Sequence, residues 1–256
     1  MTLRGILLDK DGTLIDFDAT WGPAAYRAMG VLAEGDRGRL EALMRVSQFV
    51  ETERRFLPTS PLVAGSSAHY GPLWAEALGR PATDGFFGEM DELFRVFGLE
   101  ALSPIGNPAA VVAALSERGL HVGIATNDAE RSGRDQAEAL GLIPYAPFIV
   151  GYNSGFGPKP HPGMVLGFAA HCGCSPSEVA LVGDSLHDLH AAKAAGALAV
   201  LVLTGPLGRA ARDQLAPHAD HVIETIADLP SLADELLADD SIARAVWQAG
   251  TIARES

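Results

Sequence analysis

The sequence predicts an α/β fold in which helices cover both faces of a parallel sheet. Short apolar runs typical of buried strands alternate with helical patterns along most of the 256 residues. One interval breaks this alternation, because residues 18–102 carry helical periodicity only. We therefore expect a core formed by residues 1–17 and 103–256, with an all-helical domain at residues 18–102 inserted after the first strand.

Six segments are expected to form the strands of the core. Four are strong apolar runs and two are weaker. They are residues 6–8, 122–125, 179–182 and 199–203, with the weaker 148–150 and 221–223. In a parallel sheet, ligands bind at the carboxyl ends of the strands, so the residues that follow these runs are the first candidates for a site.

The helices are marked by their end signals. Core helices are expected at residues 108–118, 129–140, 162–172 and 186–195, closed by Gly119, Gly141, Gly173 and Gly196. Asn107 is a cap for the first of them and Pro108 its first-turn proline. In the insert, apolar stripes run over residues 40–50, 72–78 and 86–97, the last between a capping Asp84 and Gly98. Residues 239–256 are expected to form a terminal helix.

Composition excludes several classes of function. The chain has 32 acidic and 19 basic residues, and its formal charge of −13 disfavours binding to nucleic acid. The cysteines, Cys172 and Cys174, are too few for a disulfide framework and favour a reducing cytoplasm. The apolar stretch 194–203 is far too short to span a membrane, and residues 1–9 lack a signal-peptide pattern. We expect a cytoplasmic protein without membrane or nucleic-acid partners.

The first strand leads directly into a motif rich in carboxylates. Asp9, Lys10, Asp11, Gly12 and Thr13 follow the run 6–8. The two carboxylates are two residues apart and are expected to face one side, while Lys10 faces away from both. Two enclosed carboxylates are costly without a counter-charge, so a cation is implied. The competing interpretation is a loop with surface acids.

Three later strand ends carry further polar groups. Thr126 and Asn127 follow the second strong run and suit a phosphate oxyanion, although a helix cap is the simpler interpretation. Lys159 stands between two prolines, which favours an aimed charge over a surface lysine. Asp184 and Asp188 form a second acidic pair after the third strong run.

In this order, the four motifs resemble those of the haloacid dehalogenase superfamily of aspartate-nucleophile phosphatases. The motifs are Asp9–Thr13 with its two acids, Thr126, Lys159, and Gly183-Asp184 with Asp188. The resemblance extends over residues 3–203 and implies a Rossmann-like core. The insert is similar to the helical cap of phosphoglycolate-phosphatase-like members of that superfamily.

The resemblance also implies roles for the acidic residues. Asp9 would be the nucleophile that forms an aspartyl-phosphate, and Asp11 the general acid and then the general base. Mg²⁺ would be held by Asp9, by the backbone carbonyl of Asp11 and by Asp184. Asp188 would either bind this metal or orient Lys159, and the sequence leaves both roles open.

The remaining site residues would contact the phosphate. Thr126 and Lys159 would neutralise charge on the transferring phosphoryl group, and Asn127 would add a hydrogen-bond donor. In the cap, Arg54 and Arg55 are candidate contacts to the substrate, although a solvated helix face is the commoner role for such a pair. Further cap candidates with weaker support are Arg27, His69 and Trp21. The histidines near the motifs, namely His161, His187 and His190, are interpreted as loop or helix-surface residues.

These features predict a hydrolase of a small phosphorylated metabolite, and the resemblance suggests phosphoglycolate. Asp11 argues against a dehalogenase, because dehalogenase members lack that second acid. A phosphonate-cleaving enzyme would need a cap lysine, and the sequence has none between Asp11 and Gly157. A sugar-phosphate mutase similar to beta-phosphoglucomutase keeps every core motif and stays open, as does a non-catalytic binding protein. The sequence does not predict the oligomeric state.

Overall fold

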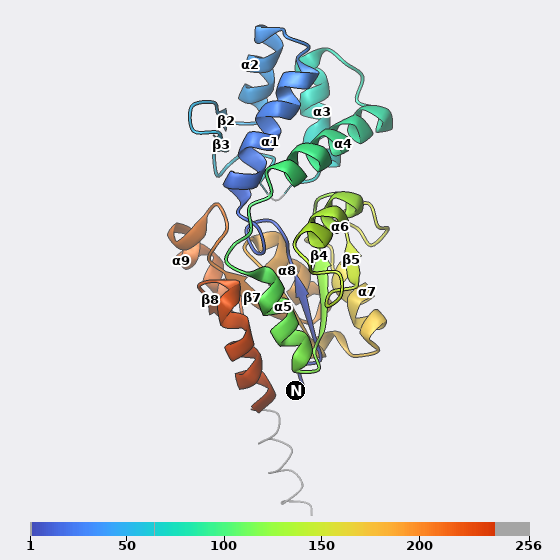
Figure 1. Ribbon diagram of the computed structural model, residues 1–256, viewed down its shortest axis with the longest axis vertical. Helices are drawn as coiled ribbons and strands as arrows, with labels where there is room; N and C mark the ends of the chain where they lie inside the picture. Colours follow the sequence, from blue (N-terminus) through green and yellow to red (C-terminus); the bar gives the residue numbers. More distant parts are fainter. Residues whose placement is uncertain (1, 64, 239–256) are drawn as a thin grey trace, which may run out of the picture.

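The computed structural model describes residues 2–63 and 65–238, in which a helical part stands above a part built on a sheet (Figure 1). All six expected strands form within a residue or two of their predicted ends. They are β1 (Gly5–Leu8), β4 (His121–Ala125), β5 (Phe148–Val150), β6 (Val179–Gly183), β7 (Leu198–Val202) and β8 (His221–Ile223). The α/β class predicted from the alternation of apolar runs and helical patterns is confirmed.

The strands form one parallel sheet in the order β5-β4-β1-β6-β7-β8. The first strand is central, with Leu8 level with Ile124 on one side and with Val182 on the other. The chain therefore winds outward from β1 in both directions, which is the doubly wound arrangement expected of a Rossmann-like core. Such a sheet opens a crevice at the carboxyl end of β1, where the two halves diverge.

Helices cover both faces of this sheet. The core helices are α5 (Pro108–Glu117), α6 (Glu130–Ala139), α7 (Gly163–Cys172), α8 (Leu186–Ala195) and the short α9 (Arg212–Leu215), and residues 229–238 are also helical. Their ends follow the expected signals: the Asn107 side chain accepts from the amide of Ala110, and Gly173 and Gly196 end helices in the left-handed conformation.

Alternation along β1 separates two apolar layers. Ile6 and Leu8 belong to a cluster with α5, while Leu7 belongs to a second cluster with α7 and α8. Both clusters consist of nearly inaccessible aliphatic side chains, which hold the sheet rigidly between them. The strand ends that carry polar residues are thereby fixed relative to one another.

The insert has its own apolar cluster, whose members all lie between Phe17 and Phe97. Its helices are α1 (Phe17–Leu32), α2 (Arg37–Val46), α3 (Ser67–Leu78) and α4 (Asp84–Glu100). The two chain segments that join it to the core are hydrogen-bonded to each other, from the Asp16 amide to the Ser103 carbonyl at 2.8 Å. The domain boundaries at residues 18 and 102 stay a prediction.

The insert is not purely helical, which differs from the expectation. Strands β2 (Phe49–Val50) and β3 (Arg55–Phe56) form a small antiparallel hairpin, so Val50 leaves the helical stripe to which we assigned it. The hairpin rests on α1 at Gly22, where an added Cβ would lie 1.7 Å from the Arg54 carbonyl oxygen. Two-residue strands are too short to give a periodic signal.

Smaller differences concern the ends of α4 and the end of the chain. Thr83, not Asp84, caps α4 by accepting from the amide of Phe86. Gly98 does not end the helix but lies inside it, where its missing side chain makes room for the Trp21 ring. The expected helix at residues 239–256 lies outside the described residues. None of the described helices is long and apolar enough to cross a membrane.

Candidate active site

Asp9 follows β1 directly and lies at the crevice of the sheet. Its amide donates to the carbonyl of Val182 on β6 at 2.8 Å, so the backbone is still tied to the sheet there. The chain then turns at Gly12, whose φ of +76° is favourable only for glycine. A Cβ on Gly12 would lie 2.5 Å from an Asp184 carboxylate oxygen, so glycine also lets Asp184 approach.

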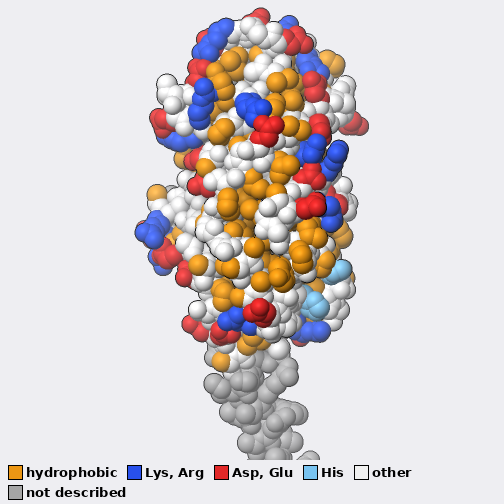
Figure 2. Space-filling model, in the orientation of Figure 1, with side chains coloured by type: hydrophobic (Ala, Val, Ile, Leu, Met, Phe, Trp, Pro, Cys, Tyr) orange, Lys and Arg blue, Asp and Glu red, His pale blue; other side chains and the backbone are white. Residues whose placement is uncertain are grey.

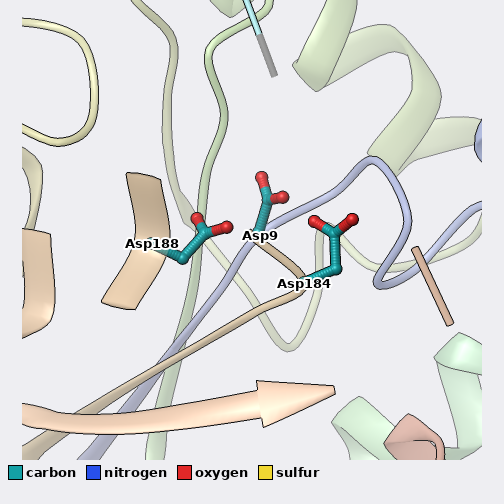
Figure 3. Close-up of side chains that lie close together, drawn as sticks. All are labelled: Asp9, Asp184 and Asp188. Atoms are coloured by element: carbon teal, nitrogen blue, oxygen red, sulfur yellow. The ribbon is translucent and has the colours of Figure 1, made fainter. Parts of the chain in front are cut away.

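Three carboxylates meet at this crevice. Oxygen atoms of Asp9, Asp184 and Asp188 lie within 4.8 Å of one another, with Asp9 between the other two (Figure 3). Burial, together with the charge of Asp188, raises the pKa of Asp9 to about 7, although Lys159 opposes the shift. Burial and the charges of Asp9 and Asp188 likewise raise the pKa of Asp184 well above its ordinary value. The cluster has more negative charge than its protein neighbours neutralise.

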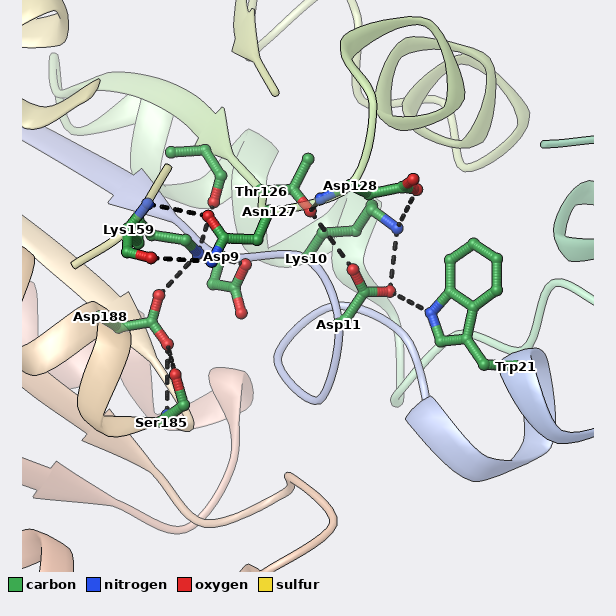
Figure 4. Close-up of polar contacts among 11 residues, drawn as sticks. Asp9, Lys10, Asp11, Trp21, Thr126, Asn127, Asp128, Lys159, Ser185 and Asp188 are labelled. Atoms are coloured by element: carbon green, nitrogen blue, oxygen red, sulfur yellow. Dashed lines mark hydrogen bonds and ion pairs between the residues drawn. The ribbon is translucent and has the colours of Figure 1, made fainter. Parts of the chain in front are cut away.

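This excess of buried oxygen charge fits a hard divalent cation. Mg²⁺ binds one or two carboxylates together with phosphate oxygens and water, and a cation here would offset the repulsion that raises both pKa values. Asp9 and Asp184 are the side chains able to hold it. The Asp11 side chain points away from the cluster toward Trp21 (Figure 4), so only the backbone carbonyl of Asp11 would be a ligand in the predicted metal site.

Lys159 is the cation that the protein itself supplies to the cluster. Its ammonium donates to Asp9 Oδ1 at 2.6 Å, to Asp188 Oδ1 at 2.6 Å and to the Ala125 carbonyl at 2.8 Å (Figure 4). Burial alone would lower the pKa of Lys159, but the carboxylates of Asp188 and Asp9 outweigh it and raise that pKa. The side chain is 3 % exposed, so it is a fixed positive charge beside Asp9.

Asp188 serves Lys159 in this structure. One of its oxygens accepts from Lys159, and the other accepts from the Ser185 hydroxyl at 2.6 Å and amide at 3.2 Å, which caps α8. Both carboxylate oxygens thus have protein partners. Of the two roles left open by the sequence, this geometry favours orientation of Lys159 over direct binding of a metal.

Asn127 holds the loop that carries Lys159. Its side-chain carbonyl accepts from the Lys159 amide at 2.8 Å, and its side-chain NH₂ donates to the Lys159 carbonyl at 2.9 Å. These two bonds fix the backbone of Lys159 next to the end of β4. The Asn127 side chain therefore positions the Lys159 loop, and the expected hydrogen bond to the phosphate from the backbone or side chain of Asn127 stays a prediction.

Asp11 lies at the centre of a second hydrogen-bond network, on the side of the helical insert, which is called the cap from here on. One carboxylate oxygen accepts from the indole N–H of Trp21 and from Lys10 at 2.9 Å, and the other from the Thr126 hydroxyl at 3.3 Å (Figure 4). Trp21 belongs to α1, so this network joins the cap to the end of β1. Thr126 is fully buried beside Asp11.

Lys10 was expected to face away from Asp11, and that expectation is wrong. Its ammonium bonds Asp11, Asp128 at 3.2 Å and Gln136 at 2.6 Å, with the side chain 2 % exposed. Strand alternation does not apply beyond Leu8, where β1 ends and the chain begins to turn. Lys10 does lie apart from Asp9, and it neutralises the acids on the cap side of the site.

A pocket extends from the acid cluster into the cap. Its core end is lined by Asp9, Asp11, Lys159 and Asp184, and its cap end by aromatic rings and Asp91. The cap-end rings are those of Phe17, Trp21, Phe56, Tyr70 and Phe94. The sequence analysis missed Asp91, Ser67 and Tyr152, which form a hydrogen-bonded chain on this wall. It also interpreted His187 as a helix-surface residue, whereas His187 lines the pocket.

The candidate arginines of the cap lie elsewhere. The Arg54 guanidinium stacks on Tyr26, 3.2 Å from the ring centroid, and Arg55 pairs with Glu53 at 2.6 Å. Neither is among the residues that line the pocket, and Arg27, which pairs with Glu100, is not among them either. The same holds for His69, His161 and His190, whereas Trp21 does line the pocket.

Comparison with known proteins agrees with this geometry. Residues 3–196 match the model of the haloacid dehalogenase-like hydrolases. The chain is 27 % identical over 238 residues to the phosphoglycolate phosphatase of Escherichia coli K12, covering 89 % of this chain and 91 % of that protein.

Solved structures agree in fold. A hydrolase from Pseudomonas syringae superposes with a TM-score of 0.63 at 23 % identity, covering 91 % of this chain and 98 % of that one. A predicted phosphoglycolate phosphatase from Haemophilus somnus 129PT gives 0.66 at 17 % identity, with the same coverage. The family match includes all four motifs that meet at the crevice. The chain is therefore a member of the haloacid dehalogenase-like hydrolase family.

Proposed function

We propose that this protein is a Mg²⁺-dependent phosphatase that hydrolyses a small phosphate monoester through an aspartyl-phosphate. The observation that carries the proposal is the placement of Asp9. It lies at the end of the central strand, between the ammonium of Lys159 and the carboxylate of Asp184, and it lines a pocket whose other end is formed by the cap. Its relatives named as phosphoglycolate phosphatases support the same class of reaction.

The first step uses Asp9 as the nucleophile. Its carboxylate oxygen attacks phosphorus, and the bond from phosphorus to the ester oxygen breaks as the alcohol leaves. Lys159, bonded to Asp9 Oδ1, orients the carboxylate and offsets negative charge as the phosphoryl group arrives. Mg²⁺, when bound, would supply charge neutralisation between the carboxylates and the phosphate. The Thr126 hydroxyl, which donates to Asp11, would turn to donate to a phosphoryl oxygen, although Thr126 is fully buried and does not line the pocket.

Asp11 would act as the general acid in the first step and as the general base in the second. It gives a proton to the departing alcohol oxygen and then takes one from the water that attacks the aspartyl-phosphate, which releases inorganic phosphate and restores Asp9. Asp11 lines the pocket and is held toward the cap by Trp21 and Lys10. This position is on the side from which both alcohol and water must come.

The mutase alternative is less well supported. A mutase holds a bisphosphate, and its second phosphate needs a cationic site in the cap. Among the described residues that line the pocket, Lys159 is the sole lysine or arginine, and it belongs to the core end. A non-catalytic binding protein is disfavoured because Asp9, Asp11, Lys159 and Asp184 are all in place.

The test is phosphate release from a panel of monoesters that includes p-nitrophenyl phosphate and phosphoglycolate, with Mg²⁺ and with chelator. We expect release that depends on Mg²⁺ and that Asp9→Asn abolishes while far-UV circular dichroism stays unchanged. Absence of release, combined with isomerisation of glucose-1-phosphate, would favour the mutase. Full activity of well-purified Asp9→Asn protein would reject Asp9 as the nucleophile.

A further inference from the structure

We propose that the alcohol part of the substrate has an apolar carbon frame that ends in a cationic nitrogen, so that the preferred esters are phosphates of amino alcohols. This inference rests on the proposed phosphatase activity and adds the substrate class. It differs from the carboxylate-bearing ester after which the relatives are named. The argument comes from the charges, the aromatic walls and one acid at the cap end of the pocket.

The first observation is the distribution of charge around the pocket. Lys159 has its three donors directed to Asp9, Asp188 and the Ala125 carbonyl, so it serves the phosphate end. The cap end has Asp91, the core residue Asp128 lines the pocket beside Lys10, and no lysine or arginine is among the described residues that line the cap end. A carboxylate on the alcohol part would face like charges there without a partner, and that arrangement is unfavourable.

The cap arginines do not compensate for this absence. Arg95 is half-buried where α4 meets α6 and pairs with Glu92 and Asp135, and Arg80 pairs with Glu89 at the surface of the insert. Figure 2 shows basic and acidic side chains lying next to each other over this end of the molecule. Both arginines are paired with acids outside the pocket, and the cap end of the pocket remains acidic and aromatic.

The second observation is the aromatic wall. Trp21 packs edge-on against Phe94 with centroids 5.9 Å apart, and Tyr70 does so at 6.1 Å. Such rings favour apolar groups, and their faces attract cations. One ring of this wall already makes a cation–π contact within the protein, because the Lys10 ammonium lies 4.7 Å from the centroid of the Trp21 ring.

The third observation is Asp91 on α4. Its carboxylate accepts from the Tyr152 hydroxyl at 2.7 Å, and the Tyr152 hydroxyl oxygen in turn accepts from the Ser67 hydroxyl at 2.9 Å. Within residues 2–63 and 65–238 no basic group lies within ion-pair distance of Asp91, unlike Asp128, which has Lys10. Burial raises the pKa of Asp91, so its charge is incompletely compensated and suits an ammonium group from a ligand.

The experiment compares esters that share one frame and differ in charge. On a benzyl frame these are para-(aminomethyl)benzyl, para-methylbenzyl and para-carboxybenzyl phosphate, with an aminobutyl, pentyl and carboxybutyl series as a shorter frame. On at least one frame we expect kcat/KM to be about tenfold higher for the ammonium ester than for the neutral one, and lowest for the carboxylate. Phosphoglycolate should be among the slower esters.

Two variants assign the preference to Asp91. Asp91→Asn should reduce the ratio of ammonium to neutral ester to about one, because the ratio cancels any general loss of activity. Glu100→Gln, which removes the same charge from an exposed position of α4, should leave the ratio unchanged. A carboxylate ester that equals the neutral one, or a ratio insensitive to Asp91→Asn, would overturn the inference. Absence of turnover on every ester, p-nitrophenyl phosphate included, would instead reject the phosphatase activity itself.

Discussion

The two ends of the pocket are built on opposite principles. At the core end, Lys159 is hydrogen-bonded to Asp9, Asn127 and Asp188 at 2.6–2.9 Å, and two apolar layers fix the sheet from which these residues come. At the cap end, aromatic rings from α1, α3 and α4 surround a single acid chain of Asp91, Tyr152 and Ser67. On the proposed function, the core end would carry out the reaction and the cap end would select the alcohol.

Two buried lysines, Lys159 and Lys10, lie on different sides of the pocket's acids. Lys159 bonds Asp9 and Asp188, and Lys10 bonds Asp11 and Asp128. Each is nearly inaccessible and each bridges two acids, but only Lys159 contacts Asp9, the proposed nucleophile. On the proposed function, Lys159 would act on the phosphate, whereas Lys10 would position Asp11.

Replacing each lysine by methionine should separate these roles and give the largest effect. Lys159→Met should lower kcat/KM by about 10²- to 10³-fold, the usual cost of removing one donor to a developing charge. Lys10→Met should lower it by about tenfold, because Lys10 acts on Asp11 and not on the phosphoryl group. The measurement is steady-state kinetics on p-nitrophenyl phosphate.

Lys159→Met leaves two buried acids without their cation and Lys10→Met leaves two half-buried ones, so folding needs its own check. Thermal denaturation should show both variants folded at assay temperature, with Mg²⁺ present to limit repulsion among the acids. Equal losses of kcat/KM in two folded variants would contradict the division between the two lysines.

A cation at the core end should have an effect on stability that grows with pH. Without a cation, the pKa of Asp9 is about 7 in the folded protein against 3.8 ordinarily, so the folded state holds a proton that the unfolded chain releases. That contribution is complete below about pH 4 and is lost as pH rises through 7, on the order of 1.4 kcal/mol per pH unit. The stabilisation by Mg²⁺ should therefore be larger at pH 8 than at pH 5.

The measurement is the melting temperature with Mg²⁺ or with chelator across this pH range. Asp9→Asn is the matched control, because it removes the titrating group and should reduce the pH dependence of the Mg²⁺ effect. A Mg²⁺ effect that is the same at both pH values would count against the carboxylate cluster as the binding site.

The core end could be predicted from the sequence because Asp9 and Asp184 directly follow apolar runs, while Lys159 stands between two prolines at the position of the third motif. An apolar run locates the strand, a parallel sheet brings the strand ends together, and Asp9, Lys159 and Asp184 meet as that logic requires. Lys10 could not be placed in the same way, because its direction depends on where β1 stops. A shift of one residue in that end changes which side a side chain faces.

The cap end could not be predicted because its selecting residues have no motif. Asp91 is one of several acids on an amphipathic helix, and Tyr152 lies in a loop far from it in sequence. Only the packing of α4 against the core brings these two together. Adjacent arginines were the conspicuous signal in the cap sequence, and the structure directs both of them away from the pocket.

Removal of those arginines should give the smallest effect. Arg54 stacks on Tyr26 and Arg55 pairs with the exposed Glu53, so neither contributes to the pocket walls. For Arg54→Ala and Arg55→Ala we expect kcat/KM within about twofold of the parent enzyme on every ester of the panel. Arg54→Ala should cost about 0.5–1 kcal/mol of stability through the lost ring contact. A tenfold loss confined to one ester would mean that the hairpin reaches the bound substrate, and the cap end would then have a cation after all.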